Sequence, residues 1–175
     1  MGAIIQQMGR LDEAWMLGLA TRRVPRWLDR AFRALTHLGG ATATIAIGLA
    51  LAAFPTTRLI GLTALVANTL SHVASQILKR RFVRRRPHLV VAALRPLIPI
   101  PDAYSFPSGH SAAAVSVALS IALHASLPIA VPIIAAALLV AASRVYLRVH
   151  FVTDVVMGSL LGAAGTMIAR LLVGS

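Results

Sequence analysis

The sequence predicts an all-α protein, a polytopic membrane helical bundle of about five transmembrane helices plus N-terminal amphipathic interfacial helices. Composition is the first observation: 58% of the 175 residues are hydrophobic, only 13% are charged, and the mean hydropathy is +0.80. A soluble domain has about a quarter of its residues charged. The second observation is that five stretches approach the roughly 20 apolar residues that a bilayer-spanning helix needs. We therefore expect a single membrane-embedded domain over residues 1–175, with an N-terminal segment 1–33 and a helical core 34–175.

The N-terminal segment is the first element. Its apolar run at 14–20 is too short to cross a bilayer, and Trp15 and Trp27 are of a residue type that favours the membrane interface. Apolar residues then recur at helical spacing between positions 28 and 35, and most nearby arginines lie off that stripe. The pattern predicts one or two amphipathic helices lying in the interface. The alternative is a tail that packs on nothing in particular.

Five membrane-spanning helices follow in the prediction. They cover residues 35–54, 59–78, 109–126, 127–147 and 151–173. The fourth carries Pro128 and Pro132 in its first turns, where proline is least disruptive. The long loop at 79–108 contains four prolines after its basic run, so it cannot be helical throughout. We expect this loop to lie over the mouth of the bundle.

The distribution of positive charge predicts the orientation. With five spans, the N-terminus, the long loop and the turn at 148–150 share one face of the membrane. That face carries 15 of the 17 Lys and Arg residues, and only Arg58 and Arg170 lie on the other. The positive-inside rule then places the basic face in the cytoplasm.

The net charge of +12 also bears on partners. In a membrane protein it indicates affinity for anionic lipids or for phosphate, and nucleic acid is not an expected partner. Cysteine is absent, which excludes disulfides, thiol nucleophiles and Cys-based metal sites.

Three clusters of ionisable residues fall on the basic face, where charges beside a span mark function. The first is "KRRFVRRRP" at 79–87. Lys79 ends the second span and Arg86 precedes Pro87, and an ammonium and a guanidinium that converge on one point make a phosphate clamp. The alternative is a polybasic patch that only contacts lipid head groups.

The second cluster is "FPSGHS" at 106–111. A Pro-Ser-Gly turn that enters a helix can direct the backbone N–H groups of Ser108, Gly109 and His110 toward an anion. His110 on the first turn is placed to donate a proton. The alternative is an ordinary helix N-cap followed by an unrelated histidine.

The third cluster is "SRVYLRVHFVTD" at 143–154, which contains Arg144, His150 and Asp154. On a helix the last two share one face, so that the carboxylate can orient the imidazole. Gly158 and Gly162 continue that face and predict close packing against a neighbouring helix. A self-contained His–Asp pair is one alternative, and a metal site that includes His110 is another. No metal is expected, because the cations of the three clusters would repel it.

The three motifs together carry a resemblance. Lys-x6-Arg-Pro, Pro-Ser-Gly-His and Ser-Arg-x5-His-x3-Asp occur in that order between residues 79 and 154. They resemble the signature of the type 2 phosphatidic acid phosphatase (lipid phosphate phosphatase) superfamily, in its small bacterial-type membrane form, and every signature position is present. The resemblance covers the second to fifth predicted spans. Many members have six spans, and this chain is predicted to lack the first.

The resemblance implies a metal-independent phosphatase that hydrolyses a lipid phosphate monoester or diphosphate through a phosphohistidine, without a cofactor. It also implies location in a bacterial-type plasma (inner) membrane. His150 would be the nucleophile, Asp154 would orient it, and His110 would act as general acid and base. The expected phosphate ligands are Lys79, Arg86, Ser108, Gly109 and Arg144. The same resemblance implies a rate optimum at neutral or mildly acidic pH.

The substrate and the oligomeric state stay open at this point. Phosphatidylglycerol phosphate, phosphatidic acid, a polyprenyl (di)phosphate and a prenyl-linked sugar phosphate are candidates, all from phospholipid or cell-envelope synthesis. A non-enzymatic protein that binds or moves anionic lipids is the alternative function.

Some charged and polar residues lie outside the signature. The remaining arginines of the basic run are expected to contact lipid head groups; these are Arg80, Arg81, Arg84 and Arg85. Three loop residues are candidates for contact with the group attached to phosphate, namely His88, Asp102 and Tyr104. Three further histidines are expected to pair inside the bundle, namely His37, His72 and His124.

Overall fold

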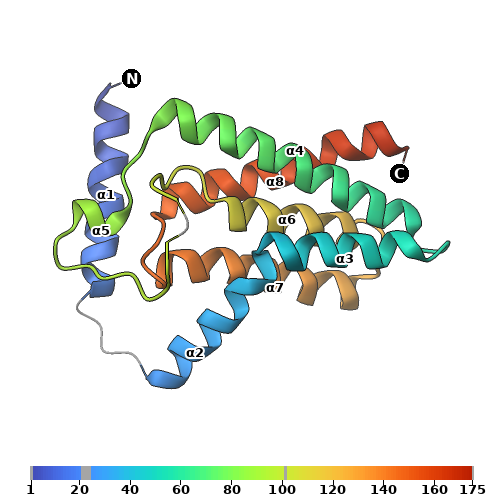
Figure 1. Cartoon of the computed structure of the whole chain (residues 1–175), viewed down its shortest axis with the longest axis horizontal. Helices are drawn as coiled ribbons and strands as arrows, with labels where there is room; N and C mark the ends of the chain where they lie inside the picture. Colours follow the sequence, from blue (N-terminus) through green and yellow to red (C-terminus); the bar gives the residue numbers. More distant parts are fainter. Residues whose placement is uncertain (1, 21–24, 101, 175) are drawn as a thin grey trace.

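The computed structural model describes residues 2–20, 25–100 and 102–174. Within them the regular elements are helices, which confirms the all-α fold class (Figure 1). The elements in order are α1 (Gly2–Ala20), α2 (Arg26–Leu35), the 3-10 helix η1 (Thr36–Gly39), α3 (Ala41–Ala53), α4 (Arg58–Phe82), α5 (Pro87–Val90), α6 (Gly109–Ala122), α7 (Leu127–Tyr146) and α8 (Val152–Val173). Helices α3, α4, α6, α7 and α8 occupy the five predicted spans.

The helices differ in how well they suit a membrane crossing. By length and apolar composition α7 and α8 qualify, and α2 with η1 joins α3 in a pair bent by 53° that qualifies as one broken span. Helix α6 has only 14 residues, and α4 has 25 residues with polar side chains among them. The membrane character is therefore confirmed, and the count of five crossings stays a prediction.

The first predicted span begins later than expected. Residues 36–39 form a 3-10 helix, and α3 starts at Ala41 after Gly40. The cause is a close approach at Gly39, where a Cβ would lie 2.8 Å from the carbonyl oxygen of His110 and 2.6 Å from the side chain of Val140. A straight helix from residue 35 could not make this contact, so the chain bends here.

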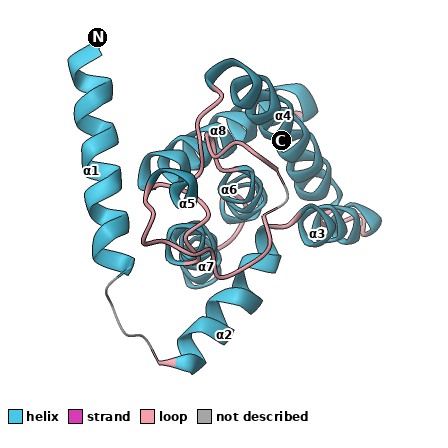
Figure 2. Cartoon of the chain, turned by 60° about the vertical axis from the view of Figure 1, so that its left-hand side comes forward, coloured by secondary structure: helices cyan, strands magenta, loops and turns pink. Residues whose placement is uncertain are grey.

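Helix α6 lies at the centre of the bundle. It packs against α4, α7 and α8, and Figure 2 shows these helices around it in an end-on view. The α6–α8 contact is close, because a Cβ on Gly158 would lie 2.3 Å from the Ser108 carbonyl oxygen and one on Gly162 would lie 2.4 Å from that of Ala112. The predicted packing of this glycine face inside the monomer is confirmed.

The N-terminal helices dock on the bundle, so the prediction's alternative of an unpacked tail is wrong. Met16 of α1 is fully buried against Val91, Leu94 and Phe151. The ring of Phe32 in α2 stacks on Tyr146 at 4.4 Å between centroids. On α1 the side chains of Leu11, Trp15 and Leu17 stay exposed, as an interfacial helix requires, and the interfacial location stays a prediction. Arg22 and Arg23, which enter the charge count, lie outside the described residues.

Candidate active site

The end of α4 and the loop after it bring two cations to one carboxylate. Lys79 lies in the last turn of α4, and its Nζ is 2.7 Å from Oδ2 of Asp102. Arg86 is 1% exposed, and its Nη2 is 2.8 Å from Oδ1 of the same carboxylate. Burial raises the pKa of Asp102, but the hydrogen bonds from Lys79 and Arg86 outweigh it and hold that pKa below its ordinary value. The two residues predicted as a phosphate clamp therefore share one anion.

Further bonds fix the Arg86 guanidinium in place. Its Nε donates to the main-chain carbonyl of Asp102 at 2.8 Å, and its Nη1 donates to that of Val149 at 2.7 Å. The same Nη1 lies 3.4 Å from Nε2 of His150. The guanidinium therefore lies directly beside the ring nitrogen that would attack phosphorus.

The start of α6 supplies the second cluster. The Ser108 hydroxyl accepts the hydroxyl proton of Ser111 at 2.9 Å and its amide at 3.4 Å, so Ser108 is a helix N-cap. The Ser108 amide donates to the main-chain carbonyl of Asp154 at 2.9 Å. The Ser108 amide is thus already engaged. Gly109 and His110 line the cavity, and they lie in the first turn of α6. The N–H groups of a first turn have no partner within the helix.

The end of α7 supplies the third cation. Arg144 is 2% exposed, and its Nη1 donates to Oγ1 of Thr36 in η1 at 2.6 Å. Its Nε is buried and has no hydrogen-bond partner among the described residues. A buried guanidinium N–H without a partner is costly unless a ligand accepts from it.

The turn between α7 and α8 places His150 beside Asp154. Nδ1 of His150 lies 3.5 Å from Oδ2 of Asp154, within ion-pair range but long for a hydrogen bond. Catalytic hydrogen bonds are often long before substrate binds. Burial lowers the pKa of His150 to about 4, and Asp154 opposes this effect while Arg144 and Arg86 add to it. The lowered pKa favours the neutral ring, which is the form that the predicted role as nucleophile requires.

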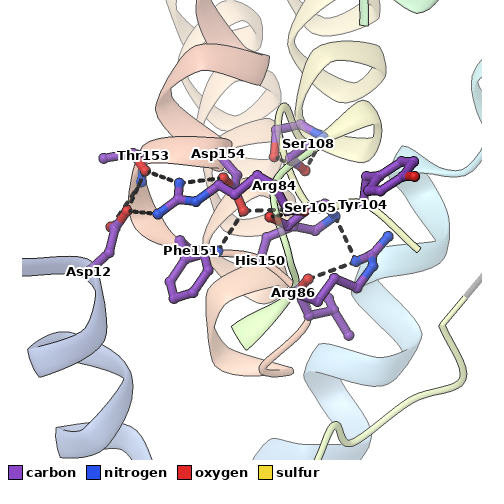
Figure 3. A network of polar contacts seen from close by, with 12 residues as sticks. Asp12, Arg84, Arg86, Tyr104, Ser105, Ser108, His150, Phe151, Thr153 and Asp154 are labelled. Carbon is purple, nitrogen blue, oxygen red and sulfur yellow. Dashed lines mark hydrogen bonds and ion pairs between the residues drawn. The ribbon is translucent and has the colours of Figure 1, made fainter. Parts of the chain in front are cut away.

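One cavity of about 480 Å³ connects these groups. Seven of the eight predicted site residues border it or contact a residue that does, and Ser108 lies behind it as the cap of α6. The predicted residues that line it are Lys79, Arg86, Gly109, His110, Arg144 and His150. Asp154 is fully buried behind His150, and Figure 3 shows the imidazole between Asp154 and Arg86.

The sequence analysis missed part of the arrangement. Arg84, expected at lipid head groups, instead lies 2.7 Å from Asp154 and 2.7 Å from Asp12 of α1. Nothing in the basic run distinguishes Arg84 from its neighbours, and the carboxylates that hold it are 72 and 70 residues away. Thr36 was missed because its contact with Arg144 spans 108 residues.

The other predicted polar residues have mixed outcomes. Of the three loop candidates, Asp102 lines the cavity, whereas His88 and Tyr104 do not. The expectation that His37, His72 and His124 pair inside the bundle is wrong, because all three are exposed. His72 lines the cavity on α4, so its exposure is toward the site. Among the described residues, no three His, Cys, Asp or Glu side chains lie close enough together to hold a metal ion.

Comparison with known families gives a match over most of the chain. Residues 60–174 match the PAP2 superfamily. This range includes all three motifs and runs from α4 to the end of α8. The match therefore covers both the predicted site and the helices that hold it.

Individual proteins are similar as well. The chain is 35% identical to phosphatidylglycerophosphatase B of Bacillus subtilis (strain 168) over 164 residues, 86% of this chain and 77% of that protein. It is 33% identical to an undecaprenyl-diphosphatase of Sulfolobus acidocaldarius over 110 residues, 63% of this chain and only 53% of that protein. Thus the chain spans about half the length of the second relative.

Two solved structures have the same fold. The crystal structure of Aquifex aeolicus LpxE gives a TM-score of 0.79 at 28% identity, covering 90% of this chain and 92% of that one. The PAP2 type phosphatidylglycerolphosphate phosphatase from Bacillus subtilis gives 0.75 at 30% identity, covering 94% and 85%.

Proposed function

The chain belongs to the PAP2 superfamily, and from this premise we propose that it is a membrane-embedded phosphatase that hydrolyses a lipid phosphate through a phosphohistidine at His150. The observation that carries the proposal is the cavity lined by His110, His150 and the cations Lys79, Arg86 and Arg144. Two imidazoles and three cations around one space suit a phosphoryl group, since its transfer needs chiefly positioning and charge stabilisation. No metal is needed in this reaction.

The first chemical step forms the phosphoenzyme. Nε2 of His150 attacks phosphorus, the bond from phosphorus to the lipid oxygen breaks, and His110 gives its proton to that oxygen. Asp154 beside Nδ1 stabilises the positive charge that develops on the ring. In the second step water attacks phosphorus and gives its proton to His110, and the P–N bond breaks to release inorganic phosphate.

The phosphoryl oxygens need donors during both steps. Lys79, Arg86 and Arg144 supply positive charge, and the amide of Gly109 at the N-terminus of α6 adds a main-chain donor. Asp102 must release Lys79 and Arg86 when phosphate binds. Ser108 contributes indirectly as the N-cap of α6, because its amide already donates to Asp154 and its hydroxyl already accepts from Ser111.

The lipid tail has a path out of this cavity. The cavity continues from the histidines between α3 and α4, where Ile45, Leu65 and Val73 line it. Ile45 and Val73 are about half exposed. The head group thus enters from the side while the tail stays in the bilayer, through a lateral opening between these two helices.

The α4 wall of the cavity favours a substrate with a hydrophilic group between phosphate and tail. Gln76, His72 and Asn68 line it at successive turns beyond Lys79. At 1.5 Å per residue the strip runs about 16 Å from Lys79 to Asn68. Ser75 is 1% exposed, and its hydroxyl has no hydrogen-bond partner among the described residues. A glycerol-containing head group, as in the substrate that names the B. subtilis relative, matches such donors and acceptors better than an isoprenoid.

The decisive experiment measures phosphate release from purified protein in detergent. Phosphatidylglycerol phosphate, phosphatidic acid and undecaprenyl diphosphate are compared with EDTA present. We expect the first to give the highest kcat/KM, and His150→Ala to lose turnover by several powers of ten. Replacing Gln76 with Leu should lower kcat/KM for the glycerol substrate more than for the diphosphate. If the wild type binds these lipids but releases no phosphate, and His150→Ala binds them equally well, the non-enzymatic alternative is correct.

The inner membrane and a cytoplasmic active site are part of the proposal. The support is the excess of Lys and Arg on the face that holds the cavity mouth. The chain has no cysteine, so a single cysteine introduced at a chosen position can be labelled selectively. Arg95 and Arg58 are both exposed and are predicted to lie on opposite faces of the membrane. In intact cells an impermeant maleimide should label Arg58→Cys and spare Arg95→Cys; the reverse pattern puts the site outside. Exposed Arg80, Arg81 and Arg85 then contact anionic lipids of the inner leaflet.

A further inference from the structure

Asp154 is held by more than its histidine. Its side chain is fully buried, and Oδ2 accepts the amide of Phe151 at 2.9 Å. Its other oxygen, Oδ1, lies 2.7 Å from Nη1 of Arg84 (Figure 3). A buried carboxylate is costly unless it is paired and hydrogen-bonded, and here the pairing cation is Arg84. The orientation of Asp154 toward His150 thus depends on a residue that does not line the cavity.

Arg84 is itself held from two further sides. Nη2 lies 2.7 Å from Oδ2 of Asp12, and Nη1 donates to Oγ1 of Thr153 at 2.6 Å. The guanidinium carbon lies 4.2 Å from the centre of the Phe151 ring, at the distance of a cation–π contact. A planar guanidinium can bind two carboxylates at once with fixed geometry, which an ammonium cannot do.

Asp12 connects this pair to the N-terminal helix. It lies on α1, is 3% exposed, and accepts the amide of Thr153 at 3.2 Å as well as the Thr153 hydroxyl. The Thr153 amide lies in the first turn of α8, where it has no partner within the helix. The carboxylate of α1 therefore completes the N-terminus of the helix that carries Asp154.

The charges of the cluster have a consequence for His150. The Arg84 guanidinium lies between the buried carboxylates of Asp12 and Asp154. With a neutral His150 imidazole, these four side chains together carry one net negative charge. When the ring becomes positive on phosphorylation, the cluster becomes neutral. Without Asp12, Arg84 would neutralise Asp154 alone, and less negative potential would remain for the ring.

We propose that Arg84 is a positioning residue that holds Asp154 against His150, and that Asp12 couples the docking of α1 to the reactivity of His150. The proposal rests on the proposed function for its kinetic consequence. Its structural core, the dependence of the His150–Asp154 contact on Arg84, does not require any substrate.

The test combines a spectroscopic and a kinetic readout on the full chain. Protein labelled with ¹⁵N-histidine in micelles is examined by NMR for the downfield proton of an imidazole N–H bound to a carboxylate. We expect this signal in the wild type, with loss in His150→Ala, Asp154→Asn and Arg84→Ala. The control is Arg95→Ala, an exposed arginine of the same loop, which should keep it.

Phosphate release from the best lipid substrate then gives a double-mutant cycle. Arg84→Ala should lower kcat by about 10- to 100-fold, the loss that is typical when a residue that orients a metal-binding side chain is removed. In an Asp154→Asn background the same change should cost less than twofold, because its effect runs through Asp154. Asp12→Asn should lower kcat by about 2- to 30-fold, the range for coupled network residues. Arg84→Lys should be intermediate.

The outcomes separate this inference from the proposed function. The inference is wrong, and the phosphatase stands, if Arg84→Ala keeps both the NMR signal and kcat. The same holds if Arg84→Ala lowers kcat by the same factor in the wild type and in the Asp154→Asn background. If the wild type turns over no lipid phosphate, the phosphatase is wrong and the NMR contrast still decides the role of Arg84. Should Arg84→Ala not fold, Arg84→Lys and Asp12→Asn carry the same comparison, and unchanged signals in both would overturn it.

Discussion

Arg84 and Arg86 come from the same basic run, two residues apart, and serve opposite sides of one imidazole. Arg86 lies 3.4 Å from Nε2 of His150 and borders the cavity. Arg84 lies behind the ring, paired with the carboxylate that faces Nδ1. Both arginines follow Val83, the left-handed residue with φ 49° that ends α4.

The two arginines differ in the anion that each binds. The side chain of Asp102, the partner of Arg86, is 41% exposed on a loop. The partners of Arg84 are Asp12 and Asp154, whose side chains are 3% and 0% exposed. A partner open to solvent can be exchanged for phosphate, whereas breaking a buried pair leaves an uncompensated charge. The exposure of the counter-ion therefore separates a binding cation from a supporting one.

The largest expected effect tests this distinction directly. Arg86→Ala should lower kcat/KM by about 10²- to 10³-fold, as for other donors that stabilise transition-state charge. It should also weaken inhibition by inorganic phosphate, because the product occupies the same cations. Arg84→Ala should leave the phosphate inhibition constant unchanged although kcat falls. Equal weakening by both changes would mean that the two arginines form a single anion site.

Much of the fold was predictable because membrane helices are defined locally. The apolar stretches gave five helices near their observed positions, and Gly158 and Gly162 predicted the close face of α8. The start of α3 was not predictable. Its position depends on Gly39 fitting against the His110 carbonyl, a contact between distant segments.

The candidate site also has a part that follows from local sequence and a part that depends on contacts between distant segments. His150 and Asp154 belong to one motif and are only four residues apart, so their closeness was predictable from the sequence, although His150 lies in the turn before α8 and not on a helical face. The role of Arg84 depends on Asp12, which approaches only because α1 docks through Met16. Within a run of similar charges, sequence alone contains no information about which arginine meets a buried carboxylate.

The second prediction extends the comparison to two glycines. At Gly158, on α8 behind the cavity, a Cβ would lie 2.3 Å from the main-chain oxygen of Ser108. At Gly109, on the cavity side, nothing lies within 4 Å of a Cβ. Gly158→Ala should destabilise the fold by about 1–3 kcal/mol, typical of overpacking, whereas Gly109→Ala should keep the melting temperature and lose activity. Thermal melting in detergent and phosphate release measure both, and a stable Gly158→Ala would contradict the packing.

The third prediction concerns the exchangeable anion. In Asp102→Asn, phosphate no longer competes with a carboxylate for Lys79 and Arg86. The inhibition constant of inorganic phosphate should fall by about fivefold, as loss of roughly 1 kcal/mol of competing interaction implies. Glu13→Gln, an exposed acidic residue on α1, is the matched control. A higher inhibition constant in Asp102→Asn would show that Asp102 assists phosphate binding instead of competing with it.

The smallest expected effect is a pH dependence that separates the two sides. His150 has a pKa of about 4 in the folded protein against an ordinary value of 6.5. Between these values the unfolded chain binds a proton that the folded one does not, so this residue lowers stability as pH falls from 6.5 toward 4. The lowered pKa of Asp102 acts mainly below its ordinary 3.8, so this carboxyl contributes little in that window. In His150→Gln the melting temperature should therefore fall less between pH 6.5 and 4 than in the wild type, by a few degrees at about 2–4 °C per kcal/mol. Asp102→Asn should show the same fall as the wild type.

The neutral His150 ring keeps the proposed nucleophile competent down to about pH 4. A decline of kcat/KM nearer neutrality must therefore come from another group. An identical pH profile of melting in wild type and His150→Gln would mean that the ring is not held neutral by burial.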